Sequence, residues 1–156
     1  MNCTLHLNGT ETALGVDGKD MLLNVLRDEV GLTSVRGTCG IGLCGTCTVI
    51  VDGQTTASCI LPVGLADGKE VTTIEGVPSD DPVKVAFEKA NAFQCGYCTP
   101  GMILTARAFL DENPDPTDDE IAEALAGNIC RCGCYVKIAD AVRLAAGMLR
   151  DEKVAA

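Results

Sequence analysis

The first half of the chain alternates apolar and polar residues with the period of two that is typical of β-strands buried on one face. An alternating stretch over residues 3–7 is followed by Asn8-Gly9, a strong signal for a tight hairpin turn, and by a second alternating run through Ala13. The pattern therefore predicts that the chain begins with a β-hairpin.

The period changes to that of an amphipathic helix over residues 21–30, where four apolar side chains share one face: Leu22, Val25, Leu26 and Val30. Asp20 is the expected N-cap of this helix, and Gly31 is the expected C-cap. After a loop rich in glycine and cysteine, a second hairpin is expected around Asp52-Gly53, and a last strand over residues 70–74. Two hairpins, one helix and a final strand predict a small α+β domain of the β-grasp kind.

Residues 75–82 combine proline, glycine and charge without periodicity, which is typical of a linker. We therefore expect one domain over residues 1–76 and a second over residues 77–156.

Helical signals fill the second domain. Asp81-Pro82 and Thr99-Pro100 each place a capping side chain beside a proline suited to the first helical turn, and Thr117 with Glu120 forms a capping box. Apolar residues recur at helical spacing after each of these starts and again over residues 136–149. The pattern predicts four short helices in a compact bundle.

Charge and composition exclude several classes of function. Lys and Arg number 12 against 22 for Asp and Glu, a net charge of -10 that disfavours binding to nucleic-acid phosphates. No stretch is apolar for long enough to span a membrane and no export signal precedes the first strand, so a cytoplasmic location is expected. Cys3 and His6, the only histidine, lie in the first predicted strand and are expected to pack there. No recognisable catalytic set is present, so the chain itself is not expected to transform an organic substrate.

Ten cysteines are the main candidates for chemistry, and eight of them fall into two groups of four. Cys39, Cys44 and Cys47 follow the plant-type ferredoxin spacing for a 2Fe-2S cluster, with Cys59 as the fourth ligand. Nearby glycines would let backbone N–H groups approach the sulfurs and offset the negative charge of the cluster: Gly37, Gly40, Gly42 and Gly45. A four-cysteine zinc site is the alternative, although such sites more often use two short Cys-x2-Cys pairs.

The second group consists of Cys95 and Cys98, followed after 31 intervening residues by Cys130 and Cys132. Both pairs fall at predicted helix ends, and a helix N-terminus favours anionic thiolates. This spacing by itself indicates a metal ion or a cluster and leaves zinc and iron–sulfur both open.

Three motifs run through almost the whole chain in a fixed order: GTCGIGLCGTCTVIVDG with Cys59, FQCGYCTPGMI, and GNICRC followed by Tyr135. In these motifs the sequence resembles the small iron–sulfur subunit of the molybdenum hydroxylases, the xanthine oxidase and aldehyde oxidoreductase family. The resemblance implies a β-grasp, plant-type ferredoxin-like domain with one 2Fe-2S cluster, followed by a four-helix bundle-like domain with a second. It also implies that Gln94 and Cys132 touch the molybdopterin of a large partner subunit.

Electron transfer is the function that this resemblance implies. Electrons from the molybdenum site would reach the cluster of the helical domain first, then the cluster of the N-terminal domain, and then FAD in a medium partner subunit. The chain would be the electron-transfer subunit of a molybdenum-dependent oxidoreductase. A free-standing two-cluster ferredoxin and a structural double-zinc module are the alternatives.

The sequence departs from the family pattern at Gly133-Cys134, where Thr-Gly is usual. Cys132 is the expected fourth ligand because it keeps the Cys-x-Cys spacing, and Cys134 is expected to pack as a small residue. Two interpretations stay open for Arg36 and Arg131, which either raise the cluster potentials by offsetting negative charge or are simply solvated.

Overall fold

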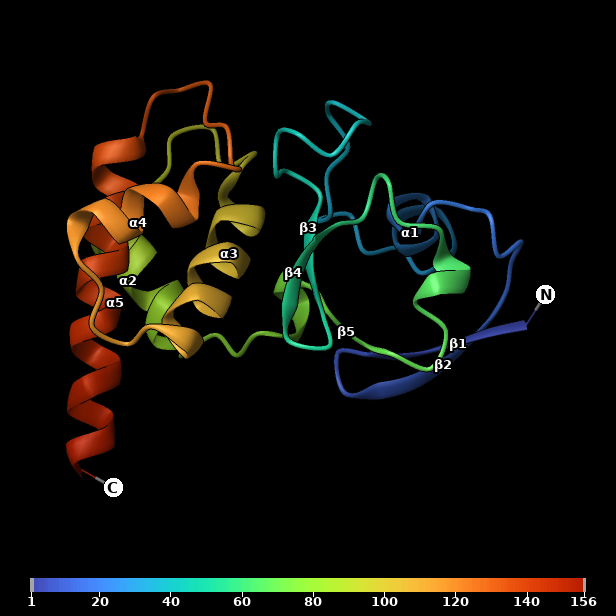
Figure 1. The fold of residues 1–156 in the computed structure, drawn as a ribbon, viewed down its shortest axis with the longest axis horizontal. Coiled ribbons are helices and arrows are strands. Elements are labelled where there is room, and N and C mark those ends of the chain that lie inside the picture. The colour runs from blue at the N-terminus through green and yellow to red at the C-terminus, as the bar shows by residue number, and fades with distance from the viewer. Residues whose placement is uncertain (1, 156) are drawn as a thin grey trace.

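The N-terminal part of the chain forms a five-stranded mixed sheet (Figure 1). The computed structural model describes residues 2–155, so the outermost residues of the two predicted domains, Met1 and Ala156, lie outside it. The strands are β1 (Asn2–Leu7), β2 (Thr10–Gly15), β3 (Thr48–Val51), β4 (Gln54–Ala57) and β5 (Glu70–Thr72). Their order in the sheet is β2-β1-β5-β3-β4, with β1 and β5 parallel and the other neighbours antiparallel.

Both predicted hairpins are present, and both turn at the expected residues. Asn8 and Gly9 have φ values of 51° and 79°, and Asp52 and Gly53 have φ values of 48° and 83°. Two successive residues with positive φ form the hairpin turn whose twist matches that of the strands. The first and last strands pair in parallel, His6 opposite Glu70, because the helical segment and the second hairpin separate them in sequence.

The predicted helix between the hairpins is present, but its start differs from the expectation. It consists of α1 (Leu22–Asn24) and a π-helical continuation, η1 (Val25–Glu29), in which the Val30 N–H donates to the Val25 carbonyl. The N-cap is Met21, whose backbone is fixed by a bridge to Pro62, whereas the Asp20 carboxylate accepts from the Asp17 N–H. The expectation that Asp20 caps the helix is therefore wrong.

The C-terminal part of the chain contains four helices: α2 (Pro82–Lys89), α3 (Thr99–Glu112), α4 (Asp118–Leu125) and α5 (Tyr135–Ala155). Asp81 caps α2 by accepting from the Val83 N–H, and the capping box at the start of α4 is complete, so both predictions are confirmed. At α3 the N-cap is Cys98. Thr99 is instead the first helical residue, and its buried Oγ1 has no hydrogen-bond partner, so the expectation that Thr99 caps this helix is wrong.

Two hydrophobic cores hold these elements. Cys3, Leu5, Leu26 and Val49 belong to the first core, between the sheet and the helical segment. Cys3 is fully buried there, in agreement with the packing role expected of it. Side chains from all four helices of the C-terminal part form the second core, among them Phe87, Met102, Ile121 and Ile138.

The sheet and the helices meet along α3, which faces β3 and β4 (Figure 1). The contact is closest at the start of α3, where a Cβ on Gly101 would lie 2.2 Å from the carbonyl oxygen of Gly45. Backbone therefore touches backbone at this point, and the cysteine-rich loop of the first domain is held against the second. Over residues 2–155, no helix combines the length and the apolar character needed to cross a membrane.

Candidate functional site

The first group of cysteines lies in the loop that leads into β3 and in the turn that follows β4. Three of its thiols are buried, those of Cys44, Cys47 and Cys59, and that of Cys39 is half-buried. The thiols of Cys39 and Cys44 lie within hydrogen-bonding reach of each other, and so do those of Cys47 and Cys59. The structure thus brings the four predicted side chains together as two pairs.

Backbone N–H groups point at the sulfurs of this loop. The Leu43 N–H donates to Cys39 Sγ at 3.3 Å, and donation from the backbones of Ile41, Cys44 and Leu43 lowers the pKa of Cys39 to about 6. In the turn after β4, burial dominates and raises the pKa of Cys59 to about 11. Amide donors of this kind stabilise thiolate sulfur and the negative charge that a cluster would bring.

Three of the four glycines predicted to free this backbone do so. Gly40, Gly42 and Gly45 have φ values of 67°, 76° and 69°, a region that other residues rarely enter. Gly37 is different: it has no positive φ, and a Cβ there would lie 3.1 Å from the side chain of Leu23. Its contribution is close packing, which corrects the expectation of backbone freedom at Gly37.

The second group of cysteines joins two loops of the helical domain. Cys95 and Cys98 precede α3, and Cys130 and Cys132 lie between α4 and α5. The thiol of Cys95 is within hydrogen-bonding reach of that of Cys132, and the thiol of Cys98 is within reach of that of Cys130. Burial raises the pKa of Cys98 to about 12, whereas the Tyr97 N–H lowers the pKa of Cys95. These contacts join the four predicted thiols two by two, and the thiol of Cys134 is also within hydrogen-bonding reach of that of Cys130.

Thiol contacts that join the cysteines two by two fit a two-iron cluster. In a 2Fe-2S cluster held by four cysteines, each iron takes two thiolates, so the ligands divide into two pairs. A structural zinc site needs all four sulfurs around one point. The donor sets and the amide-lined loop therefore fit the clusters predicted for both sites.

The two sites are joined directly through the backbone. The N–H of Ile129, the residue before Cys130, donates to the carbonyl of Cys44 at 3.0 Å. Beside this bond, the buried amide of Asn128 donates to the Gly45 carbonyl at 3.2 Å and accepts from Thr105 Oγ1 at 3.1 Å. A predicted ligand of the first site, Cys44, is thus one hydrogen bond away from the residue next to Cys130, a predicted ligand of the second.

Gln94 and Cys132, the residues expected to touch a pterin, are both exposed and line one open cavity of about 450 Å³. The other lining residues come from the same two loops and the start of α5: Phe93, Gly133, Cys134, Val136 and Lys137. The structure therefore brings these two predicted residues together at the surface, next to the second group of cysteines.

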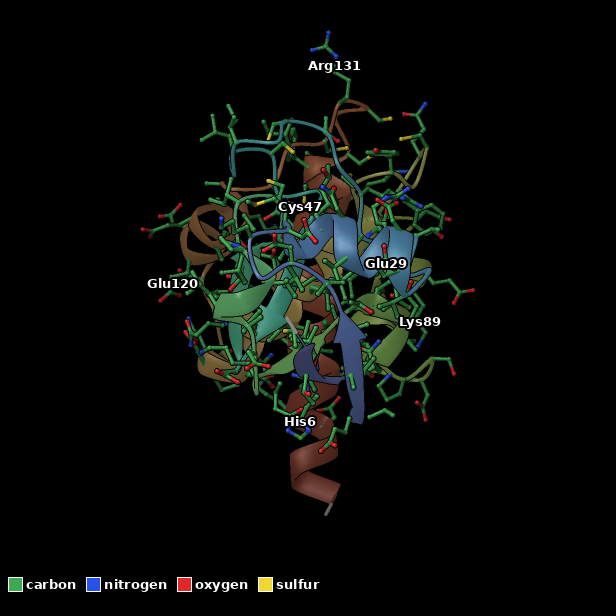
Figure 2. The ribbon with its side chains drawn as sticks, turned by 90° about the vertical axis from the view of Figure 1, so that its right-hand side faces the viewer. His6, Glu29, Cys47, Lys89, Glu120 and Arg131 are labelled. Atoms are coloured by element: carbon green, nitrogen blue, oxygen red, sulfur yellow. The ribbon has the colours of Figure 1, made fainter. Side chains whose placement is uncertain are left out.

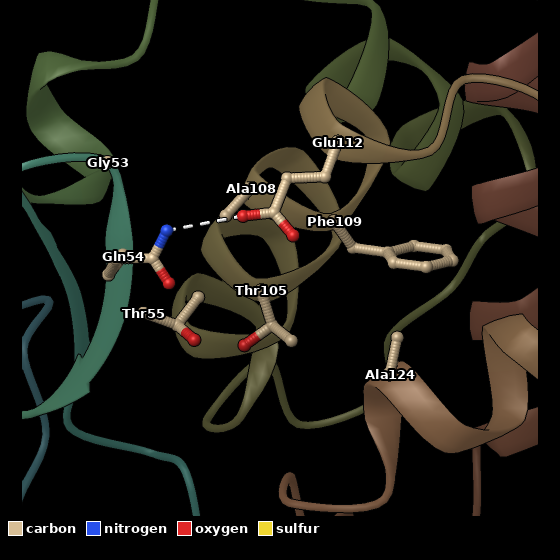
Figure 3. Close-up of a pocket in the computed structure, with 8 residues that line it drawn as sticks. All are labelled: Gly53, Gln54, Thr55, Thr105, Ala108, Phe109, Glu112 and Ala124. Carbon is tan, nitrogen blue, oxygen red and sulfur yellow. Dashed lines mark hydrogen bonds between the residues drawn. The ribbon is translucent and has the colours of Figure 1, made fainter.

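A second cavity, of about 180 Å³, lies between the β3–β4 hairpin and α3 (Figure 3). Gln54 donates to Glu112 across it at 3.2 Å, and Glu112 is the one ionisable side chain among its lining residues. A single carboxylate already held by a hydrogen bond has no partner for acid–base work. This cavity therefore offers no acid–base pair, and the cysteine loops remain the candidate site.

Each half of the chain matches a known protein family. The family described as "2Fe-2S iron-sulfur cluster binding domain" matches residues 5–72, and the "[2Fe-2S] binding domain" family matches residues 73–143. The nicotinate dehydrogenase small FeS subunit of Eubacterium barkeri is 49% identical, over 90% of this chain and 92% of its own length. The chain belongs to the iron–sulfur subunit family of the molybdenum hydroxylases. The predicted family and the presence of two 2Fe-2S binding domains are thereby confirmed.

Other relatives agree in sequence and in structure. A second nicotinate dehydrogenase chain, from Pseudomonas putida, is 44% identical, over 92% of this chain and 93% of its own length. Quinoline 2-oxidoreductase from Pseudomonas putida superposes with a TM-score of 0.92 at 36% identity, covering 97% of this chain and 96% of that chain. An aldehyde oxidoreductase from Desulfovibrio desulfuricans gives the same TM-score at 43% identity, with 97% of this chain matched to 17% of a much longer one. The predicted α+β fold, a ferredoxin-like domain followed by a helical domain, is confirmed.

Thr46 and Asn128 were not singled out from the sequence, yet both lie at the sites. Thr46 Oγ1 is 3.3 Å from Cys44 Sγ, and Asn128 joins the two cysteine loops. Tyr135 was noted only as part of a motif, and its hydroxyl accepts from the Cys130 N–H at 2.8 Å. Each lies within five residues of a predicted ligand, so polar residues inside the cysteine motifs were the available signal.

Metal analysis tests the assignment of two clusters. Iron and acid-labile sulfide measured on the purified chain should give about four irons per chain, the sum of two 2Fe-2S clusters. Two zinc ions per chain with no iron would contradict the assignment and favour a structural module.

Proposed function

We propose that this chain is the electron-transfer subunit of a molybdenum hydroxylase complex, carrying electrons from the molybdopterin site of a large partner through two 2Fe-2S clusters to a FAD-binding medium partner. Bound in this way, the clusters supply one-electron steps at potentials set by hydrogen bonds, burial and charge. The observation that carries the proposal is the Ile129 N–H bond to the Cys44 carbonyl, which places the two four-cysteine sites in direct backbone contact.

The eight ligands that we propose are Cys39, Cys44, Cys47 and Cys59 for the first cluster, and Cys95, Cys98, Cys130 and Cys132 for the second. The second site is open at the surface, where Cys95 and Cys132 are exposed. Gln94 borders the same cavity and offers an amide that both donates and accepts hydrogen bonds. We place the pterin of the large partner here, against Gln94 and Cys132.

The first site presents a different surface. Its loop exposes two large apolar side chains, Ile41 and Leu43, at 64% and 67% of their full area, and Ile60 adds a third beside Cys59. Gly42 lies against one of these side chains, since a Cβ on Gly42 would lie 2.6 Å from the side chain of Ile60. Exposed apolar side chains gathered in one place mark an interaction surface, and we assign this one to the FAD-binding partner.

Substrate choice, on this proposal, lies with the large partner, because the described residues of this chain offer no acid–base or nucleophilic set. We place the complex in the cytoplasm, a compartment where cysteine thiols stay reduced and available as ligands.

A turnover assay follows from this division of labour. The purified, iron-loaded chain should exchange electrons with a small redox mediator and should not oxidise nicotinate, a quinoline or an aldehyde at a measurable rate. Assays with each compound and an artificial electron acceptor check this. Turnover by a preparation shown to be free of molybdenum would contradict it.

Co-purification separates the proposed complex from a free-standing ferredoxin. An affinity-tagged chain isolated from its native host should elute with one molybdenum-containing and one flavin-containing subunit in equal amounts. A chain that elutes alone with its iron intact would favour the free-standing ferredoxin.

A further inference from the structure

Arg36 reaches from the loop of the first cysteine group to the loop of the second. Its Nη1 donates to the Gly96 carbonyl at 2.5 Å, and its guanidinium carbon lies 4.9 Å from the ring centroid of Tyr97. The Tyr97 hydroxyl in turn donates to the Gly37 carbonyl at 3.1 Å. Gly96 and Tyr97 are the two residues between Cys95 and Cys98, so the cation is held against a ligand loop of the second cluster.

The backbone of Arg36 is tied to the first site. Thr46 Oγ1 donates to the Arg36 carbonyl at 2.9 Å and lies 3.3 Å from Cys44 Sγ. The Arg36 N–H donates back to the Thr46 carbonyl at 3.3 Å. One residue therefore connects a ligand of the first cluster, through its backbone, to the ligand loop of the second, through its side chain.

The positive charge of Arg36 is not neutralised by a carboxylate. None of the ion pairs among the side chains described, those of residues 3–151, involves it, and the side chain is half-buried. A cluster with four thiolates is anionic and becomes more so on reduction, so a nearby unpaired cation favours the reduced state. Partial burial reduces the screening of this effect by solvent and salt.

Arg131 provides the contrast, because it is closer in sequence to the ligands. It stands between Cys130 and Cys132, yet its side chain is exposed and points away from the rest of the molecule (Figure 2). A solvated guanidinium interacts weakly with a charge inside the protein. Of the two arginines, the geometry selects Arg36.

We propose that Arg36 is a positioning residue for electron transfer between the clusters: it fixes the Cys95–Cys98 loop against the first site and raises the reduction potential of the second cluster. The inference rests on the proposed function, because it requires that both sites hold clusters. Arg36, which is not a proposed ligand, would thereby change the difference in reduction potential between the two clusters.

A redox titration of the iron-loaded chain, followed by electron paramagnetic resonance, tests this. In Arg36→Gln, the equilibrium for reducing the second cluster should shift about tenfold toward the oxidised form, equal to ~59 mV for one electron. The first cluster should shift less, because the guanidinium of Arg36 makes its hydrogen bond and its ring contact at the Cys95–Cys98 loop. Arg36→Lys keeps the charge and should recover most of the lost potential. The matched control, Arg131→Gln, should leave both potentials close to those of the wild type.

The outcomes separate this inference from the proposed function. Two intact signals with an unchanged second potential in Arg36→Gln, or a larger shift in Arg131→Gln, would overturn the role of Arg36 and leave the two-cluster assignment standing. Loss of the second signal alone in Arg36→Gln and in Arg36→Met, with recovery in Arg36→Lys, would support the positioning role. Loss of both signals in all three Arg36 variants would overturn it, because the residue would then be needed for the whole fold.

Discussion

Cys132→Ser should abolish the cluster of the helical domain, whereas Cys134→Ser should retain it. The thiol of Cys132 lies beside that of Cys95, so these two thiols can form one of the two pairs that we propose as ligands. Gly133 has a φ of 75° and turns the chain immediately afterwards. Cys134 then lies beside Cys130 instead, and its N–H donates to Cys130 Sγ at 3.5 Å. An oxygen ligand in place of the Cys132 thiolate removes the soft donor that iron–sulfur clusters require.

Electron paramagnetic resonance of the reduced chain provides the readout. The N-terminal cluster serves as an internal control, because its signal should be the same in both variants and in the wild type. The expected result for Cys132→Ser is loss of one of the two signals and of about half the iron. Should Cys134→Ser lose the signal and Cys132→Ser keep it, the ligand assignment is wrong.

Gly101→Ala should destabilise the chain by about 1–3 kcal/mol or more, the usual cost of overpacking a tight interior. The added Cβ would lie 2.2 Å from the carbonyl oxygen of Gly45. That obstacle is backbone in a loop that is also held by Asn128, so it cannot rotate away as a flexible side chain would. The start of α3 and the first cysteine loop would have to separate, which loosens the junction between the two sites.

Gly147→Ala is the matched control, since Gly147 is also a helical glycine. It lies within α5, and a Cβ there would have no neighbour within 4 Å outside the local backbone of the helix. Alanine is favoured over glycine in a helix by about 1 kcal/mol, so this variant should be more stable than the wild type. Each kcal/mol corresponds to about 2–4 °C in Tm for a chain of this size, which thermal unfolding of the iron-loaded chain resolves. Equal Tm changes in both variants would contradict the close contact at Gly101.

Local sequence signals predicted most of the fold. Asn8-Gly9 and Asp52-Gly53 fix the hairpins because both residues of each pair adopt positive φ, and Asp81 and Thr117 start helices through hydrogen bonds to residues two and three positions away. Interactions of this range depend on residue type and spacing alone.

The failures have a common physical origin in tertiary contacts. Asp20 is a good capping residue, but the bridge between Met21 and Pro62, far along the chain, moves the helix start by one residue. Thr99 is a residue type that often caps helices and it precedes a proline, yet Cys98 occupies the N-cap position of α3. The capping preference of a residue is overridden where a distant segment or the preceding turn fixes the local backbone conformation.

Sequence motifs located the candidate site but not its assembly. The spacing grouped the cysteines and the resemblance added Gln94, and these assignments of individual ligands stay predictions. The bond from Ile129 to Cys44 and that from Arg36 to Gly96 join backbone carbonyls to residues 60 or more positions away. Every residue carries the same backbone carbonyl, so the sequence of residue types does not indicate which carbonyl accepts such a hydrogen bond.

We propose that this one chain carries two different 2Fe-2S clusters that exchange electrons with each other. The most direct test is the electron paramagnetic resonance spectrum of the fully reduced chain, with iron measured on the same sample. We expect two distinct signals of equal intensity, broadened by their mutual interaction, from about four irons per chain. A single signal from about two irons, or a silent sample that contains zinc, would contradict it.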